Sequence, residues 1–251
     1  MKKLFLFNLF FVVILNNGIY SQQDILSKGS YNCYLNKTSG KSPIFKNEDS
    51  PNTPRHTFDI QNYTINLDIR SCFISPYPHS YTGYEIVQFL VDTALNQITL
   101  NANNASLQVN SVGLSGTSFT HSGDIVTITL DRTYNPNEVV NVRVNFQHLN
   151  ISDNSFYTGG GGVFTDCEPE GARGWFPCWD RPSDKATLDI TVKVPANARL
   201  GSNGKLMDST TTGDSLFYHW KSRDNIATYL MVMTGKVNYN LNTFALRRAF
   251  L

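Results

Sequence analysis

The chain has 251 residues and a formal net charge of +1, and 41% of its residues are hydrophobic. This length can bury the core of one large domain or two small ones, and the hydrophobic share is ordinary for a soluble protein. Because the charge is nearly balanced, the sequence has neither the basic footprint of a nucleic-acid-binding protein nor an acidic tail, and we expect no nucleic-acid partner.

The first 21 residues have the layout of a secretory signal peptide. Two lysines precede an apolar run from Leu4 to Leu15, and small, polar and turn-prone residues follow as far as Ser21. The alternative, a transmembrane anchor, needs ~20 apolar residues, and this run has only about twelve. We therefore predict a cleaved signal peptide over residues 1–21, a secreted or periplasmic protein, and no membrane span after cleavage.

Two segments lack the periodicity of regular structure. Residues 22–54 are rich in Ser, Asn and Lys and contain three prolines, so we expect a poorly ordered leader. The glycine run from Gly159 to Gly162 is expected to belong to a flexible loop.

From His56 onwards the apolar residues recur with a period of two, as in half-buried strands. Tyr63–Ile69 and Val139–Phe146 show this alternation most clearly, and no stretch carries a sustained 3.6-residue repeat. Further strands are expected at Tyr84–Val91, Gln97–Asn101, Ser106–Leu114, Asp124–Leu130, Val163–Thr165, Ala186–Val194, Leu216–Lys221 and Ala227–Val237. Many short strands separated by turns predict an all-β sandwich or barrel-like domain.

The four cysteines are compatible with disulfides in an exported chain, and three pairings are possible. The spacing does not choose among the pairings, although Cys167 and Cys178 are close enough to close a small loop. Free buried thiols are an equally good interpretation. The cysteines are Cys33, Cys72, Cys167 and Cys178.

Residues 163–195 contain a dense loop between two strands. Trp175 and Trp179 give this loop so much apolar surface that we expect it to be packed. Pro169 restrains Glu168 to extended backbone, so this carboxylate leaves a strand end on a stiff support, where it could bind an ammonium ion.

On spacing alone, a structural ion pair of Glu168 with Arg173 or Arg181 is the simpler interpretation. The loop can also be compared with known families, because an ordered series of residues runs through it. The series is Thr165, Asp166, Cys167, Glu168, Ala172, Arg173, Phe176-Pro177-Cys178, Asp180, Pro182, Lys185-Ala186-Thr187 and Asp189-Ile190.

This series resembles the amino-terminal domain of the aminopeptidase N family of zinc metallopeptidases, including its leukotriene-hydrolase relatives. Gly201–Gly204 and Ala227–Val237 also match a turn and the final strand of that domain. The likeness spans roughly residues 56–240 in order, and a pattern of this length is specific. It implies a large antiparallel β-sandwich or saddle-like domain, which we assign to residues 55–240.

The resemblance also implies roles for two residues. Glu168 matches the carboxylate that binds the free amino terminus of the peptide substrate in this family. Asp166 stands where the family has a glutamine that helps to line the first side-chain pocket, so the chemistry of that pocket departs from the family pattern.

Residues that could bind the zinc of this family are missing from the sequence. The intact enzymes use H-E-x-x-H on a helix, where zinc activates the attacking water. No two histidines here are four apart, and the family's G-x-M-E-N segment is absent. We therefore expect no catalytic residue, metal or cofactor in this chain, and we expect the chain alone to be inactive. Its expected partner is the catalytic domain, which is missing from this sequence. The histidines are His56, His79, His121, His148 and His219.

Residues 241–251 match nothing in the family, and we interpret them as an atypical tail of a truncated or frameshifted reading frame. Two other functions stay open. The chain could be a stand-alone exported β-sandwich that binds a peptide or glycan, if Trp175 and Trp179 are exposed as a platform. A small hydrolase with paired acids, Glu168 with Glu170 or Asp180, has no other support.

Overall fold

The computed structural model describes residues 57–113 and 115–240. The predicted signal peptide, the predicted leader, the tail 241–251 and the residues Cys33 and His56 lie outside these ranges. Among the described residues, no helix is long and apolar enough to cross a membrane.

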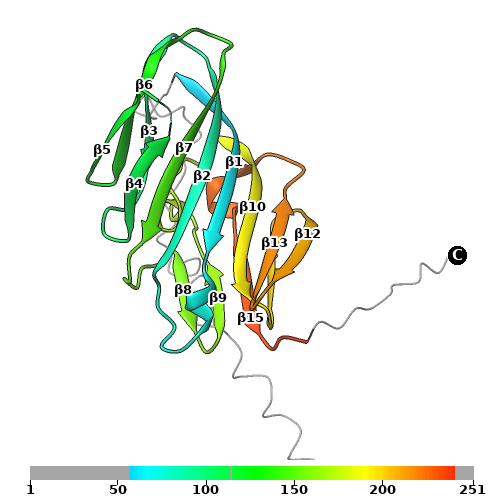
Figure 1. Ribbon diagram of the computed structural model, residues 1–251. Coiled ribbons are helices and arrows are strands. Elements are labelled where there is room, and N and C mark those ends of the chain that lie inside the picture. The colour runs from blue at the N-terminus through cyan, green and yellow to red at the C-terminus, as the bar shows by residue number, and fades with distance from the viewer. Residues whose placement is uncertain (1–56, 114, 241–251) are drawn as a thin grey trace, which may run out of the picture. The chain divides into compact units, whose positions relative to one another are not determined.

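The described residues form fifteen strands and three short 3₁₀ helices (Figure 1). The strands are β1 (Phe58–Asp68), β2 (Tyr81–Val91), β3 (Leu95–Asn101), β4 (Leu107–Gly113), β5 (Ser118–Ser122), β6 (Ile125–Tyr134), β7 (Val139–His148), β8 (Phe156–Gly159), β9 (Gly162–Thr165), β10 (Lys185–Pro195), β11 (Ala198–Ser202), β12 (Lys205–Thr212), β13 (Ser215–Lys221), β14 (Ile226–Ala227) and β15 (Met233–Val237). The 3₁₀ helices are η1 (Arg70–Phe73), η2 (Ala172–Gly174) and η3 (Thr228–Leu230).

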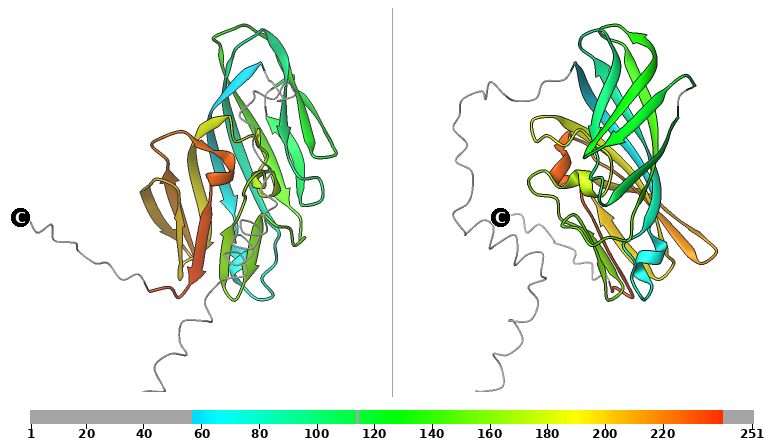
Figure 2. Two further views of the ribbon diagram at one scale, coloured as in Figure 1. Left: turned by 180° about the vertical axis from the view of Figure 1, so that it is seen from behind. Right: turned by 90° about the vertical axis from the view of Figure 1, so that its left-hand side faces the viewer.

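The strands make three sheets. An eight-stranded sheet has the order β12-β13-β10-β1-β2-β7-β4, with β14 also paired to β10. A four-stranded sheet has the order β11-β15-β9-β8, and a three-stranded sheet has the order β3-β6-β5. Figures 1 and 2 show the three-stranded sheet towards the β4 end of the large sheet, far from β12. Every strand pair in the described ranges is antiparallel except β1 with β10, which confirms the predicted all-β, largely antiparallel class.

Alternating burial explains the central strands. In β7, Val140, Val142, Val144 and Phe146 are buried while the residues between them are exposed or half-buried. Burying one such side chain contributes about 1.5–3 kcal/mol to folding, so a register in which all four face the core is strongly favoured. The sequence periodicity therefore predicted this strand and its buried face correctly.

The strand predicted over Ala227–Val237 is interrupted in the structure. β14 leaves the large sheet at Ala227, the η3 turn follows, and β15 joins the four-stranded sheet. The Thr228 hydroxyl donates a hydrogen bond of 2.7 Å to the buried carboxylate of Asp180, and the Met231 amide donates one of 2.9 Å to the Thr228 carbonyl. These bonds hold the chain in a turn, and so the strand prediction was wrong at Thr228–Leu230.

The glycine run expected to be a flexible loop forms a two-residue hairpin turn between β8 and β9. Gly159 pairs with Gly162, and the two residues between them have φ of +56° and +76°. A turn with two positive φ angles matches the twist of the flanking strands and favours glycine at both positions. The Gly161 carbonyl also accepts a hydrogen bond of 2.9 Å from the Val237 amide, which ties the turn to β15.

The three cysteines in the described ranges, Cys72, Cys167 and Cys178, are free and buried. The small loop that a bond between Cys167 and Cys178 would close is therefore not formed. Burial raises the pKa of the Cys72 thiol to about 12. These thiols are protonated at neutral pH and contribute to the core as small apolar groups.

Candidate functional site

The loop between β9 and β10 is held on both sides by the core. Trp175 is fully buried and Trp179 is 9% exposed, which confirms the prediction of a packed loop. The Trp179 amide donates a hydrogen bond of 3.0 Å to the Tyr63 hydroxyl on β1, and Cys178 exchanges backbone hydrogen bonds with Asn101 on β3. Because both tryptophans are buried, the exposed platform on which the glycan-binding alternative depends is not formed.

A buried carboxylate organises the centre of this loop. The Asp180 side chain has no exposed surface and accepts hydrogen bonds from Arg173 Nε at 3.0 Å and from the Thr228 hydroxyl at 2.7 Å. Arg173 Nη2 lies 2.9 Å from the Glu170 carboxylate, and Arg181 Nη1 lies 3.1 Å from the same group. Both arginines therefore form ion pairs with Glu170 or Asp180, which assigns these two acids a structural role.

Glu168 lies just beyond the carboxyl end of β9, at the start of a turn. Its side chain is exposed, and the Glu168–Pro169 peptide bond is cis. The turn is closed by a hydrogen bond of 2.7 Å from the Gly171 amide to the Cys167 carbonyl. The structure thus presents the Glu168 carboxylate at the surface, on a loop whose other side is anchored in the core.

Asp166 precedes Glu168 by two residues and lies beside an aromatic pair. Its amide donates a hydrogen bond of 3.0 Å to the Ser155 carbonyl on the neighbouring segment. Tyr157 and Phe164 stack in parallel with ring centroids 4.6 Å apart. Burial and then the charge of Asp166 raise the pKa of Tyr157. A half-buried acid next to two aromatic rings can line a side-chain pocket.

Three of the described histidines, His121, His148 and His219, contact groups outside this loop. His148 Nε2 lies 3.3 Å from Asp153, His219 Nε2 lies 2.6 Å from Asp189, and His121 contacts a backbone carbonyl. Within residues 57–113 and 115–240, no group of three or more His, Cys, Asp or Glu side chains could hold a metal ion. The side chains present in this part of the chain do not fit a zinc ion.

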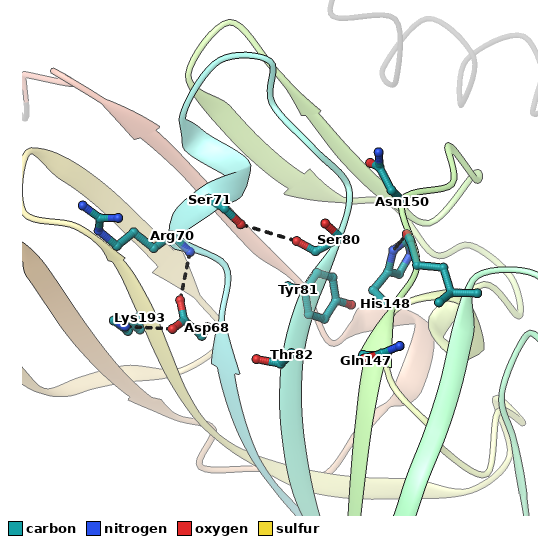
Figure 3. A pocket seen from close by; sticks show the side chains of 11 residues that line it. Asp68, Arg70, Ser71, Ser80, Tyr81, Thr82, Gln147, His148, Asn150 and Lys193 are labelled. Carbon is teal, nitrogen blue, oxygen red and sulfur yellow. Dashed lines mark hydrogen bonds and ion pairs between the residues drawn. The ribbon is translucent and has the colours of Figure 1, made fainter.

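A polar cavity of about 510 Å³ is a second candidate, which sequence reasoning missed. Its lining residues come from η1 and from the ends of β1, β2, β7 and β10 or the loops beside them (Figure 3). Lys193 Nζ lies 2.8 Å from Asp68, and Arg70 forms an ion pair with Asp214. Since these charges already have partners in the protein, the cavity does not define a ligand.

The family is decided by comparison with known sequences. A model of the Peptidase M1 N-terminal domain matches residues 56–230. The chain belongs to this family. The resemblance proposed from the sequence is thereby confirmed, and the site described above is a feature of a Peptidase M1 N-terminal domain.

Two relatives show how much of a longer protein this domain represents. Aminopeptidase M1 of Arabidopsis thaliana is 36% identical over 76 residues, which is 30% of this chain and 9% of the relative. Probable aminopeptidase 1 of Sulfurisphaera tokodaii is 24% identical over 188 residues, which is 70% of this chain and 21% of the relative. The chain therefore spans only a small part of the curated relatives that it matches.

The M1 zinc metallopeptidase from Deinococcus radiodurans has a similar fold. Its structure matches with a TM-score of 0.64 and 23% identity, over 72% of this chain and 42% of that one. At this identity the likeness concerns the fold, and it supports the β architecture of the M1 N-terminal domain described above.

Proposed function

We propose that this chain is the amino-terminal, substrate-recognition domain of an exported zinc aminopeptidase, and that Glu168 binds the free amino terminus of the peptide substrate. The observation that carries the proposal is the placement of Glu168. Glu168 is exposed just beyond the carboxyl end of β9, on a loop that is anchored in the core. Membership of the M1 N-terminal domain family and the aminopeptidase names of the relatives support the substrate class.

The chemistry of this role is charge-assisted hydrogen bonding. An ammonium group offers three donors to a carboxylate, and a rigidly supported acceptor loses little entropy when it binds them. A peptide held by its amino terminus places its first peptide bond at a fixed distance from Glu168, which favours removal of one residue at a time.

Asp166 is proposed to shape the pocket for the first side chain of the substrate. Its charge raises the pKa of Tyr157, which stacks on Phe164. An acid at the edge of an aromatic surface favours a first residue that is basic or carries a hydrogen-bond donor, and disfavours an acidic one.

No step that involves zinc is assigned to this chain, since its described side chains do not fit the ion. In this proposal the catalytic domain of the enzyme is the partner that supplies the metal and the general base. Export is proposed from the amino-terminal pattern of the sequence, in which two lysines precede the apolar run Leu4–Leu15.

Glu168→Gln is expected to weaken recognition of a free amino terminus. The test uses a chimera that joins the domain to the remainder of the Deinococcus radiodurans metallopeptidase, assayed with the peptide Tyr-Ser-Ala. Loss of a charge-assisted hydrogen bond costs about 1.5–3 kcal/mol, so kcat/KM should fall about 10- to 100-fold.

Glu170→Gln is the matched control, because Glu170 is two residues away and its side chain pairs with arginines. It should change kcat/KM by less than about threefold, since exposed ion pairs contribute little. Equal effects of the two substitutions would reject the role of Glu168. N-acetylated Tyr-Ser-Ala should be a poor substrate of the unaltered chimera and should not distinguish the variants.

A further inference from the structure

A groove of about 1090 Å³ lies between the β12–β13 hairpin and the four-stranded sheet, and neither Asp166 nor Glu168 lines it. We refer to it as the β12–β15 groove. Its apolar lining includes Phe164, Leu206, Leu216 and Trp220, and its cationic lining consists of Arg199 and Lys236.

The hairpin contributes to the groove an exposed apolar side chain, Leu206, next to the half-buried Trp220. Leu206 on β12 is paired in register with Trp220 on β13, and both line the groove. Leu206 is 38% exposed, and every residue of β12 is exposed. An uncovered apolar surface of this kind marks a place where apolar ligand atoms can be removed from water.

The opposite wall carries two cations side by side. Arg199 on β11 and Lys236 on β15 are directly opposite in the register of the sheet. Like charges in this arrangement repel each other and reduce stability. The lining contains no Asp or Glu, and no carboxylate of the described residues forms an ion pair with either cation. A single bound anion would relieve the repulsion.

The groove also contains an unused hydrogen-bond donor. Trp220 Nε1 is buried from solvent and has no hydrogen-bond partner in the described part of the chain. Leaving a buried donor unpaired is unfavourable, so this indole contributes to the wall chiefly through its apolar ring. The two cations of the lining, Arg199 and Lys236, are both donors, so they select for an acceptor.

We propose that the β12–β15 groove binds an amphipathic anion, an unbranched hydrocarbon chain that ends in a carboxylate, as in a fatty acid. The chain lies along Leu206, Leu216 and Trp220, and the carboxylate is bound by Arg199 and Lys236. Neither Asp166 nor Glu168 lines the groove, whereas Phe164, which stacks on Tyr157, does.

The probe is dodecanoate, titrated below its micelle concentration into the 251-residue chain and followed by calorimetry. Dodecan-1-ol has the same hydrocarbon chain without the charge and is titrated in parallel. Dodecanoate should bind with one-to-one stoichiometry and about tenfold more tightly than the alcohol, a difference of about 1.4 kcal/mol.

The double variant R199Q/K236Q should bind dodecanoate about tenfold more weakly and should no longer distinguish it from the alcohol. Lys205→Gln is the control for charge, since Lys205 is an exposed cation on β12 that does not line the groove. It should leave both affinities unchanged. The double variant should fold, because it removes a repulsive pair, and its unfolding curve verifies this.

Leu206→Gln tests the apolar wall and should weaken the binding of both ligands. Met207→Gln is its control, because Met207 is the next residue on β12, is 51% exposed and does not line the groove. Equal affinity for acid and alcohol, no effect of R199Q/K236Q, or equal effects of the Leu206 and Met207 variants would each overturn the proposal. Binding of a peptide but not of dodecanoate would overturn it as well.

Discussion

Replacing Asp180 with alanine is expected to lower the free energy of unfolding by about 3 kcal/mol, near the lower end of the cost of breaking a buried ion pair. The carboxylate is fully buried and accepts hydrogen bonds from Arg173 Nε, the Arg173 amide and the Thr228 hydroxyl. Its removal leaves these donors facing an apolar interior. Arg173 keeps its contact with Glu170 and is 20% exposed, so part of its charge can still be solvated.

Urea unfolding of the unaltered protein and of Asp180→Ala measures this difference in the free energy of unfolding. Glu170→Gln provides the matched control, because the Glu170 side chain is 39% exposed and contacts the same arginine. Its effect should stay below about 1 kcal/mol. If the two variants lose similar amounts of stability, the ion pair between Asp180 and Arg173 does not organise the loop. A large loss from Asp180→Ala alone would show that this buried acid, with Arg173 and Thr228, stabilises the fold.

The sequence predicted those strands that bury one face and expose the other. β1, β7 and β10 were found because their apolar residues alternate. β12 was not found, since all of its residues are exposed and Leu206 and Met207 are adjacent, which destroys the period of two. The short β8 was also missed, because a four-residue strand next to glycines carries too little pattern.

The candidate site was predictable only through its likeness to a family. Glu168 was identified as a recognition residue by its place in an ordered series of residues. Its spacing to Arg173 and Arg181, taken alone, favoured a structural ion pair. The structure pairs these arginines with other acids. The hydrogen bond between Thr228 and Asp180 spans 48 residues, and no local pattern can predict such a contact.

The burial of Glu85 could not be predicted from the sequence either. It leads to the second prediction of a large change in the free energy of unfolding. Both faces of the strand Tyr84–Val91 are rich in apolar residues, so the sequence does not reveal which face is interior. In the structure Glu85 is fully buried between its register partners Ile65 on β1 and Val144 on β7. Neither of its carboxylate oxygens has a hydrogen-bond partner among residues 57–113 and 115–240. This is a carboxyl group whose charged form would be strongly disfavoured.

Glu85→Leu is expected to raise the free energy of unfolding by about 1–3 kcal/mol at neutral pH, the usual cost of an unsatisfied buried polar group. Burial raises the pKa of Glu85 well above its ordinary value of 4.5. The ionisable neighbours Tyr63 and Cys178 also have raised pKa values, chiefly through burial, and are neutral at this pH. No nearby charge in this group compensates the carboxylate, so leucine, of similar size, should be better accommodated.

The stabilisation by Glu85→Leu should depend on pH in a defined direction. Below pH 4.5 the carboxyl group is protonated in both the folded and the unfolded chain, so titration contributes nothing there. Above that value the unfolded chain loses the proton first, and the unaltered protein loses up to about 1.4 kcal/mol of stability per pH unit until its raised pKa is passed. The advantage of the variant should therefore grow as the pH rises.

Urea unfolding of both proteins from about pH 5 to 8 tests this, since the other groups titrate equally and cancel in the difference. Gln88→Leu is the control on the same strand, because Gln88 is half-buried and donates a hydrogen bond to Asn141 on β7. Its effect should be independent of pH. If Glu85→Leu changed the free energy of unfolding by the same amount at every pH, as expected for Gln88→Leu, the Glu85 carboxylate would have to reach water. A rising difference would show that the large sheet carries a proton in its core, and that alkaline conditions weaken the fold through this single residue.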